Sequence, residues 1–352
     1  MAEEKSGLWA LLATACAVTG LVVLAGFVVA PHGDEAALNP AALHPTDGAT
    51  YIAGPQSVLP QTELVAEPRL GRPVTLTKKP EPKVRKAPVD PPALDFTISS
   101  FNVLGSSHTA RGGAHARFAP GRVRMQAASS LVLDHGVDVV GFQEMQADQL
   151  GVFLRNTGGA FDVYPGYSLG RLNTENSIAW RRDMWTAVER RTFSIPYFRG
   201  HHRLMPMVKL RSNDTGLEAW FLNVHNPAST GQWGNNQHWR DVATGIETGL
   251  VNQLRESDGV PVFFTGDFNE RADVYCRFVT STDLEAALGG SGDGGCQPPS
   301  IRYVDWIFGS PEATFSGYVE DAGQVVRRTS DHPMIVSSAH VEDDPAAAAP
   351  AQ

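Results

Sequence analysis

Short apolar runs recur between residues 94 and 341, and most of them are too short to form helices. The runs at 137–143 and 260–264 lack a polar face, which is typical of strands buried on both sides. The run at 94–103 is predicted to be the first strand. Strand-like runs outnumber helical ones and several are joined by short polar turns. The pattern therefore predicts mixed or antiparallel sheets rather than a doubly wound parallel sheet.

Helices and hairpins are predicted from spacing and from turn residues. Three segments have helical spacing: residues 121–135, 145–156 and 237–256. Two pairs of strand runs flank short polar turns and are predicted hairpins: residues 176–181 with 185–194, and residues 205–210 with 217–224. Gly136 follows the first helix in the position of a C-cap. The sequence contains no glycine-rich dinucleotide motif and no phosphate-binding P-loop.

Six of the strand-like runs carry polar side chains at or next to one end. These side chains are Asn102, Glu144, His225, Asp267 with Asn269, Asp305, and Asp331 with His332. A single motif of this kind is compatible with an ordinary turn, because Asp and Asn are common turn residues. Six of them in one chain favour a functional site, because the ends of core strands hold polar groups rigidly.

In this order the segments resemble the endonuclease/exonuclease/phosphatase family, the metal-dependent phosphoesterases that include pancreatic deoxyribonuclease. The resemblance spans residues 94–341. It implies a fold of the α/β (α+β) class, a four-layer sandwich of two packed mixed or antiparallel sheets flanked by helices. Some relatives that act on abasic DNA place an acid two residues after the first-strand asparagine. Leu104 stands at that position, which weakens a repair-endonuclease reading.

The resemblance also implies roles for the residues at the strand ends. Mg²⁺ is the expected ion, with Mn²⁺ or Ca²⁺ as alternatives, because Mg²⁺ prefers carboxylate oxygens and water. The expected metal residues are Glu144, Asn102 as a neutral ligand or an orienter, and Asp331 directly or through water. The expected catalytic residues are His332 as general base, Asp305 as its orienter, Asp267 and Asn269 around the water or phosphate, and His225 at the phosphate.

Substrate-binding residues are marked less clearly by the sequence. The polar residue that the family carries in mid-domain corresponds to Glu175 or Asn176. Arg199 and Arg203 suit bidentate phosphate contacts but could equally belong to a solvated loop. The aromatic and imidazole side chains near the His225 segment could line a specificity surface or pack as core residues of the following helix: Trp233, His238 and Trp239.

Composition predicts four regions: a membrane segment at residues 1–30, a linker at 31–92, a catalytic domain at 93–341 and a disordered tail at 342–352. Residues 8–30 contain no charged residue and are long enough to cross a lipid bilayer. We expect an uncleaved signal anchor in the cell membrane with the domain outside, the alternative being a secreted protein after signal cleavage. Residues 31–92 hold 12 of the 24 prolines, which favours an extended linker.

Cys276 and Cys296 are the only cysteines after the predicted membrane segment. An even number of cysteines in an exported region predicts a disulfide, and two free thiols are the alternative. The pair flanks the segment between Asp267 and Asp305. A bridge would therefore tie down the connection between two strands of the expected site.

The net charge of the predicted domain helps to judge which substrates it could bind. The chain has a net charge of −9, and residues 93–340 contain 21 Lys and Arg against 26 Asp and Glu, a net charge of −5. An acidic domain argues against tight duplex-DNA binding, yet 20 of the 21 cations are arginines. The expected function is that of a monomeric phosphodiesterase, with a nuclease as the leading reading. The alternatives are a phosphatase or phospholipase C acting on sugar, inositol or sphingolipid phosphates, and an inactive binding module.

Overall fold

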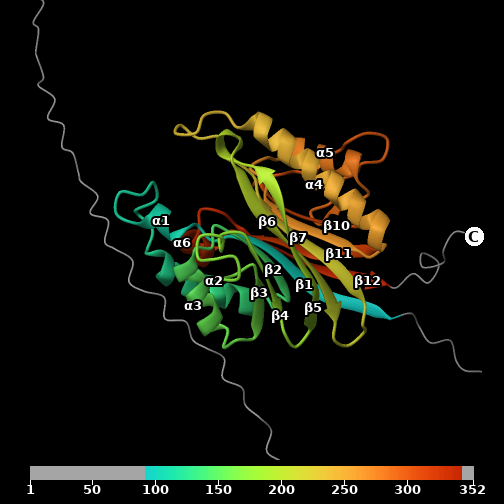
Figure 1. The fold of residues 1–352 in the computed structure, drawn as a ribbon, viewed down its shortest axis with the longest axis horizontal. Helices are drawn as coiled ribbons and strands as arrows, with labels where there is room; N and C mark the ends of the chain where they lie inside the picture. Colours follow the sequence, from blue (N-terminus) through green and yellow to red (C-terminus); the bar gives the residue numbers. More distant parts are fainter. Residues whose placement is uncertain (1–91, 343–352) are drawn as a thin grey trace, which may run out of the picture. The chain divides into compact units, whose positions relative to one another are not determined.

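Two six-stranded sheets stack face to face in the computed structural model, which describes residues 92–342 (Figure 1). The first sheet has the order β11 (Ala313–Asp321), β12 (Met334–Glu342), β1 (Ala93–Asn102), β2 (Val139–Gln143), β4 (Ser177–Arg181), β3 (Phe161–Tyr164). The second has the order β5 (Trp185–Pro196), β6 (His202–Ser212), β7 (Glu218–His225), β8 (Val262–Asp267), β10 (Asp305–Gly309), β9 (Glu285–Ala286). Each sheet contains one parallel pair, β1 with β2 and β7 with β8, and the other pairings are antiparallel.

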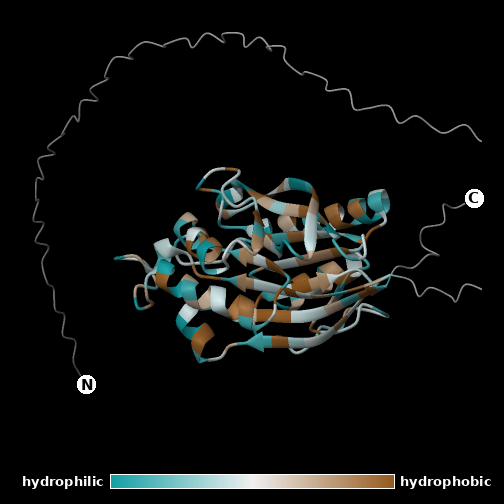
Figure 2. Cartoon of the chain, turned by 90° about the horizontal axis from the view of Figure 1, so that it is seen from below, coloured by the Kyte–Doolittle hydropathy of each residue, from teal (hydrophilic) through white to brown (hydrophobic). Residues whose placement is uncertain are grey.

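Helices cover the outer faces of both sheets, which completes four layers. The first sheet is covered by α2 (Gly121–Asp134), α3 (Ala147–Asn156) and α6 (Gln324–Thr329), and the second by α4 (Gln237–Asp258) and α5 (Ala272–Ser281). One apolar cluster fills the space between the sheets and one lies under each helical layer. Figure 2 shows apolar residues recurring along the strands between these layers. The predicted sandwich of two mixed sheets flanked by helices is confirmed.

The predicted hairpin of residues 176–181 with 185–194 is wrong. Both strands exist, but β4 pairs with β2 and β3 in the first sheet, whereas β5 pairs with β6 in the second. β4 is buried along most of its length because sheet partners lie on both edges and apolar layers lie on both faces. The turn after Arg181 therefore carries the chain across the sandwich. The hairpin of β6 and β7 is confirmed, with Gly216 in the left-handed region at φ 77°.

A buried polar layer joins the two sheets directly below the strand ends. Gln143 donates from Nε2 to Asn223 Oδ1 at 2.7 Å, and Asn223 donates from Nδ2 to the Phe142 carbonyl at 2.8 Å. A Cβ atom on Gly141 would lie 2.1 Å from Thr265 Oγ1, so only glycine allows the sheets to approach this closely. These bonds fix the two halves of the sandwich against each other where the polar strand ends meet.

Cys276 on α5 forms a disulfide with Cys296, as the cysteine count predicted, and their Cα atoms are 5.3 Å apart. In the chain-entropy model, closing a loop of this length stabilises the fold by ~3 kcal/mol. No helix within residues 92–342 is long and apolar enough to span a membrane. The predicted membrane segment at residues 8–30 lies outside the described residues, as do the linker up to residue 91 and the tail after Glu342.

Candidate active site

The sheet topology brings the six polar strand ends to one edge of the sandwich. The parallel strands β1, β2, β7 and β8 all end at this edge, and the antiparallel strands β10 and β12 begin there. Asp305, the first residue of β10, lies directly opposite Asp267, the last residue of β8. Ser330 donates from Oγ to the Asn102 carbonyl at 2.6 Å and so holds the start of β12 against the end of β1.

Asn102 links the two sheets through its buried amide. Its Nδ2 donates to Glu144 Oε1 at 3.1 Å and to Asp267 Oδ2 at 3.0 Å, and its Oδ1 accepts the Leu104 N–H at 3.0 Å. The Leu104 donor fixes the amide orientation, because the opposite side must then present N–H groups to both carboxylates. Of the two roles predicted for Asn102, this arrangement favours orienting the carboxylates over binding an ion through oxygen.

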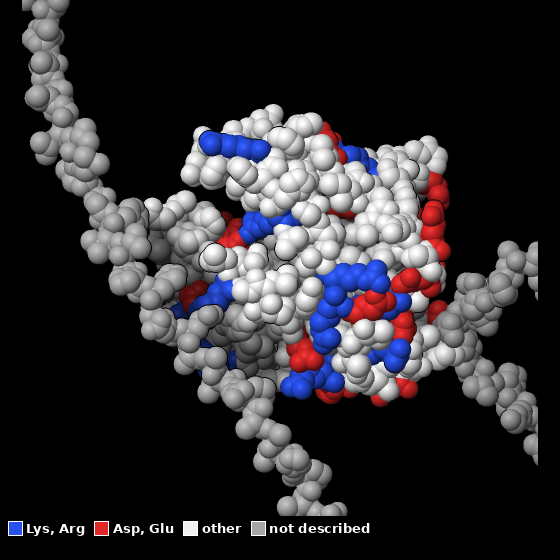
Figure 3. Space-filling view, viewed as in Figure 1, with Lys and Arg blue, Asp and Glu red and all other residues white. Residues whose placement is uncertain are grey.

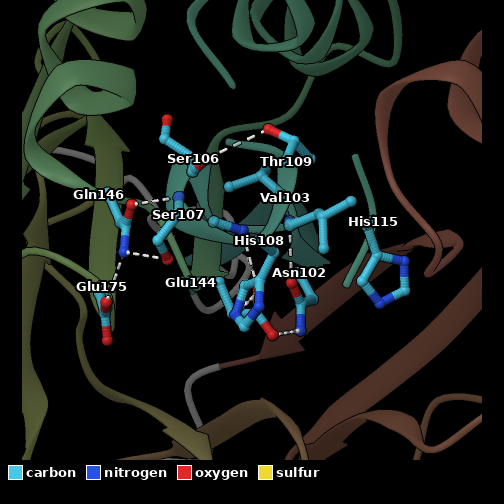
Figure 4. Close-up of polar contacts among 12 residues, drawn as sticks. Asn102, Val103, Ser106, Ser107, His108, Thr109, His115, Glu144, Gln146 and Glu175 are labelled. Carbon is cyan, nitrogen blue, oxygen red and sulfur yellow. Dashed lines mark hydrogen bonds and ion pairs between the residues drawn. The ribbon is translucent and has the colours of Figure 1, made fainter. Parts of the chain in front are cut away.

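Glu144 is held in place by its backbone and by three neighbours (Figure 4). Its φ of 59° lies in the left-handed region, which side chains other than glycine adopt rarely and at an energetic cost. Its Oε2 accepts the Gly105 N–H at 2.9 Å and lies 3.3 Å from His108 Nε2. Burial raises the pKa of Glu144, but the imidazoles of His225 and His108, together with these hydrogen bonds, outweigh it and lower the pKa to about 2. The carboxylate is therefore ionised at neutral pH.

His332 lies between two carboxylates. Its Nδ1 is 3.0 Å from Asp305 Oδ2, and its Nε2 is 3.5 Å from Asp267 Oδ2. Burial lowers the pKa of His332, but the attraction of Asp305 and Asp267 outweighs it and raises the pKa well above its usual value. Burial also raises the pKa of Asp267. The resting site therefore holds a proton on the His332 ring, and this proton must leave before His332 can act as a base.

His225 and Asn269 complete the surroundings of Asp267. His225 Nε2 is 3.5 Å from Asp267 Oδ2, and burial lowers the pKa of this histidine, which favours its neutral form. The Asn269 N–H donates to Asp267 Oδ1 at 3.0 Å, while its side-chain amide donates to the Asn226 carbonyl at 2.8 Å. The Oδ1 atom of Asp267 thus accepts a hydrogen bond from Asn269, and its Oδ2 atom accepts one from Asn102 and lies close to His225. These contacts hold the carboxylate in one orientation.

A cleft of about 560 Å³ opens above these groups. Most of the predicted site residues line it: Glu144, Glu175, Arg203, His225, Asp267, Asn269, Asp331 and His332. Arg203 forms an ion pair with Glu175. Four predicted residues do not line the cleft: Asn102 and Asp305 are buried beneath it, Asn176 is buried, and Arg199 is exposed and packs over the Trp233 ring.

Two histidines at the site carry no assignment from the sequence. His108, on the short helix α1 (Ser106–Thr109), contacts Glu144, and His115 Nε2 is 3.7 Å from Asp331 Oδ2. Both line the cleft (Figure 4). The available signal was two histidines in a glycine-containing loop that directly follows the Asn102 strand.

An aromatic wall borders the cleft on another side. It consists of Tyr197, Phe198 and Trp233, and the last two stack with ring centroids 4.9 Å apart and an interplanar angle of 4°. Arg203 lies over the Tyr197 ring at 4.6 Å. Of the aromatic and imidazole residues singled out in the sequence, Trp233 lines the cleft, whereas His238 and Trp239 lie on α4 and do not.

The donor set fits a divalent cation that prefers oxygen. Glu144 is ionised and faces the cleft, and its side chain is 19% exposed, so it remains available for an ion. Atoms of Asp267, Asp305 and His332 also lie within 4.8 Å of one another, close enough to surround an ion. Both groups are therefore candidate cation sites, and the carboxylate of Glu144 is more exposed to the cleft than those of Asp267 and Asp305.

A buried acid lies behind the site. Glu247 on α4 is fully buried, and its Oε2 accepts only the Asn226 amide, at 3.4 Å. Its other oxygen has no partner among the described residues. Burial raises the pKa of Glu247 to about 8, against the lowering effect of Asn226 and Arg277. Because Asn226 also accepts the Asn269 amide through its carbonyl, this acid lies in the layer that supports the site.

Replacing Glu247 by glutamine is expected to flatten the pH dependence of stability. The folded-state pKa lies above the unfolded-state value, so unfolding releases a proton and wild-type stability falls as pH rises from about 4.5 to about 8. Between pH 5 and pH 8, Glu247→Gln should gain about 3 kcal/mol in the free energy of unfolding relative to the wild type. Urea unfolding at both pH values measures this gain. An equal effect at pH 5 and pH 8 would show that Glu247 ionises normally.

Comparison with known proteins identifies the family. The model of the endonuclease/exonuclease/phosphatase family matches residues 99–332. An endonuclease/exonuclease/phosphatase family protein from Bacteroides thetaiotaomicron has a similar fold, with a TM-score of 0.56 and 19% identity, covering 72% of this chain and 97% of that one. A mannosyl-6-phosphatase from the same organism has a TM-score of 0.52 and 19% identity, covering 69% and 99%. The human Nocturnin catalytic domain has a TM-score of 0.54 and 16% identity, covering 71% and 97%.

No curated protein sequence matches the chain. The structural neighbours share its fold at low identity, whereas the family match covers the segment that contains all six polar strand ends. Members of this family are hydrolases that act on phosphate esters, generally with divalent metal ions. The chain belongs to the endonuclease/exonuclease/phosphatase family.

Proposed function

We propose that the protein is a Mg²⁺-dependent phosphodiesterase that acts on nucleic acid. The observation that carries this proposal is the contact of Asn102 with both Glu144 and Asp267, which joins residues from the two sheets into one polar floor under the cleft. A phosphate on this floor would meet His225, Asn269 and His332 along one side. Such an arrangement of fixed polar groups stabilises charge that develops on a phosphoryl group.

Glu144 and Asp331 would hold the cation, with Asn102 orienting Glu144. When bound, Mg²⁺ supplies neutralisation of the phosphoryl oxygens and acts as a Lewis acid. Asp305 holds His332 through Nδ1, so that Nε2 points toward Asp267 and the cleft. His332 would then exchange a proton at Nε2 with the attacking water, and Asp267 and Asn269 would orient that water.

The aromatic wall supports a nucleoside-containing substrate. Aromatic side chains stack on nucleobases without strong preference for sequence. Arg203, which borders the same cleft, can contact a phosphate oxygen through its planar guanidinium. A strand end or unpaired nucleotide suits this cleft better than an intact duplex, because the domain has a net charge of −5, whereas a dedicated duplex binder is usually basic.

A phosphatase acting on a sugar or lipid phosphate is the second candidate. The observation in its favour is the concave cleft of about 560 Å³, which lies in the size range of small-molecule sites. For either substrate, we propose that the domain acts outside the cell, anchored through residues 8–30. The Cys276–Cys296 disulfide supports that location, because disulfides persist in oxidising compartments.

A substrate panel with and without chelator tests the proposal. The full-length protein should cleave oligonucleotides and bis(p-nitrophenyl) phosphate, lose this activity in EDTA and regain it with added Mg²⁺. Phosphomonoesters, including a sugar phosphate, should be cleaved far more slowly. Release of phosphate from monoesters without diester cleavage would support the phosphatase instead. Diester cleavage that persists in EDTA would contradict the metal-dependent mechanism.

A further inference from the structure

A second hollow, of about 380 Å³, lies on the surface outside the catalytic cleft. Its lining is Arg117, Phe118, Ala119, Arg327 and Arg328. Three of its five lining residues are therefore cationic and none is acidic. Within residues 92–342, none of the three arginines forms an ion pair.

Other arginines of the domain do have acidic partners. In Figure 3, a patch of charged residues of both signs is visible at the lower right of the face. Arg181, Arg191 and Arg211, for example, each pair with a carboxylate. In the hollow, Arg117 lies over the Phe118 ring at 5.5 Å and Arg327 donates to the Ala322 carbonyl. Three cations that share a concave surface without carboxylates form a site suited to an anion, because guanidinium groups bind phosphate through charge-assisted hydrogen bonds.

The hollow borders the catalytic cleft through two segments of the chain. His115 and Asp331 line the cleft, and they lie two residues before Arg117 and three residues after Arg328. A residue spans at most about 3.6 Å of chain, so the backbones of these arginines lie within about 11 Å of the cleft rim. The arginine side chains extend this reach, so a strand with one phosphate in the cleft can place another phosphate, a few nucleotides away, in the hollow.

Buried Arg124 fixes the hollow relative to the catalytic residues. Its guanidinium donates to the Val103 carbonyl at 2.6 Å, to the Thr329 carbonyl at 2.7 Å and to the Ala119 carbonyl at 2.9 Å. It thereby joins the segment after Asn102, the segment of the hollow and the segment that leads to Asp331. Only 2% of Arg124 is exposed, so the cross-link is part of the folded core. A site held in this way binds without having to order loose loops.

We infer that this hollow binds a phosphate of the substrate strand a few nucleotides from the phosphate being cleaved. The inference rests on the proposed function and narrows it to a polynucleotide rather than a mononucleotide or a sugar phosphate. A polynucleotide is favoured because the hollow lies outside the cleft, and only an extended substrate can reach both sites at once.

The test compares a long and a short substrate in the full-length protein. The variant is Arg117→Gln with Arg328→Gln. The control is Arg155→Gln with Arg190→Gln, which removes the same charge from two exposed arginines on α3 and β5 that line neither site. For a 12-nucleotide substrate, the hollow variant should lose about 10- to 100-fold in kcat/KM, because two charged contacts are removed. For bis(p-nitrophenyl) phosphate, it should stay within about twofold of wild type, since that diester has no second phosphate.

Binding provides a second readout that does not depend on turnover. In EDTA, fluorescence anisotropy of the labelled 12-mer should show weaker binding by the hollow variant and a salt dependence shallower by about two phosphate contacts. Inositol bisphosphate should compete poorly. Three results would each overturn the inference. The hollow variant could lose equal kcat/KM on both substrates, or it could lose none on the 12-mer. Inositol bisphosphate could also compete for the labelled 12-mer as well as unlabelled 12-mer does. If the wild type cleaves the model diester but no oligonucleotide, this inference fails alone. If it cleaves no diester at all, the proposed function fails, while the anisotropy result still reports on the hollow.

Discussion

Replacing His332 by alanine is expected to lower kcat on a diester substrate by about 10²- to 10⁴-fold, the range for loss of a general acid–base group. His332 is the one imidazole at the site that contacts both buried aspartates, Asp305 through Nδ1 and Asp267 through Nε2. No other described group near the cleft is placed to exchange a proton while Asp305 balances its charge. The measurement is kcat under saturating Mg²⁺ on the substrate that the panel identifies.

Stability must be followed in the same experiment. Removing the ring leaves the buried Asp305 carboxylate without its partner, and an unpartnered buried charge destabilises a fold. His332→Gln retains a donor for Asp305, so it should fold more stably than His332→Ala and remain as inactive. His340→Ala serves as a control, because His340 lies on the exposed part of β12 and should leave turnover unchanged. Wild-type turnover in both His332 variants would exclude this histidine from the mechanism.

Replacing Glu144 by glutamine is expected to weaken the apparent Mg²⁺ affinity by at least about 10- to 100-fold. Loss of a residue that only orients a metal ligand already has an effect of this size, and loss of a direct ligand should have at least the same effect. The substitution keeps the shape of the side chain but removes the charge that the site holds ionised at neutral pH. Excess Mg²⁺ or Mn²⁺ should therefore restore part of the activity. Titrating kcat/KM against metal concentration, with calorimetry of metal binding, measures the change.

The control for Glu144→Gln is Glu285→Gln, which removes one exposed carboxylate from β9 and should leave the metal titration unchanged. If Glu144→Gln folds normally and binds Mg²⁺ as tightly as the wild type, the cation is not on Glu144. The group of Asp267, Asp305 and His332 would then be the next candidate. If the variant does not fold, the bond from the Gly105 N–H to Glu144 is structural.

The sequence by itself determined those features that depend on neighbouring residues along the chain. The α4 helix and the β6–β7 hairpin follow from local spacing and from Gly216, and both are present. The six polar strand ends were visible for the same reason, because an apolar run and the polar group that ends it are contiguous. The disulfide followed from the count of cysteines, since Cys276 and Cys296 had no other partner outside the predicted membrane segment.

Only the tertiary structure decided which strands pair and which side chains meet. Local pattern suggested that β4 and β5 form a hairpin, but burial of β4 on both faces places them in different sheets. Asn102 and Asp267 are 165 residues apart, and only the packing of the two sheets brings them within hydrogen-bonding distance. His108, His115 and the aromatic wall lie in one-turn helices and the loops around them, which are too short for a periodic pattern to indicate where a side chain points. Their places at the cleft are set by contacts with distant strands, because loop side chains take their positions from the scaffold on which the loops rest.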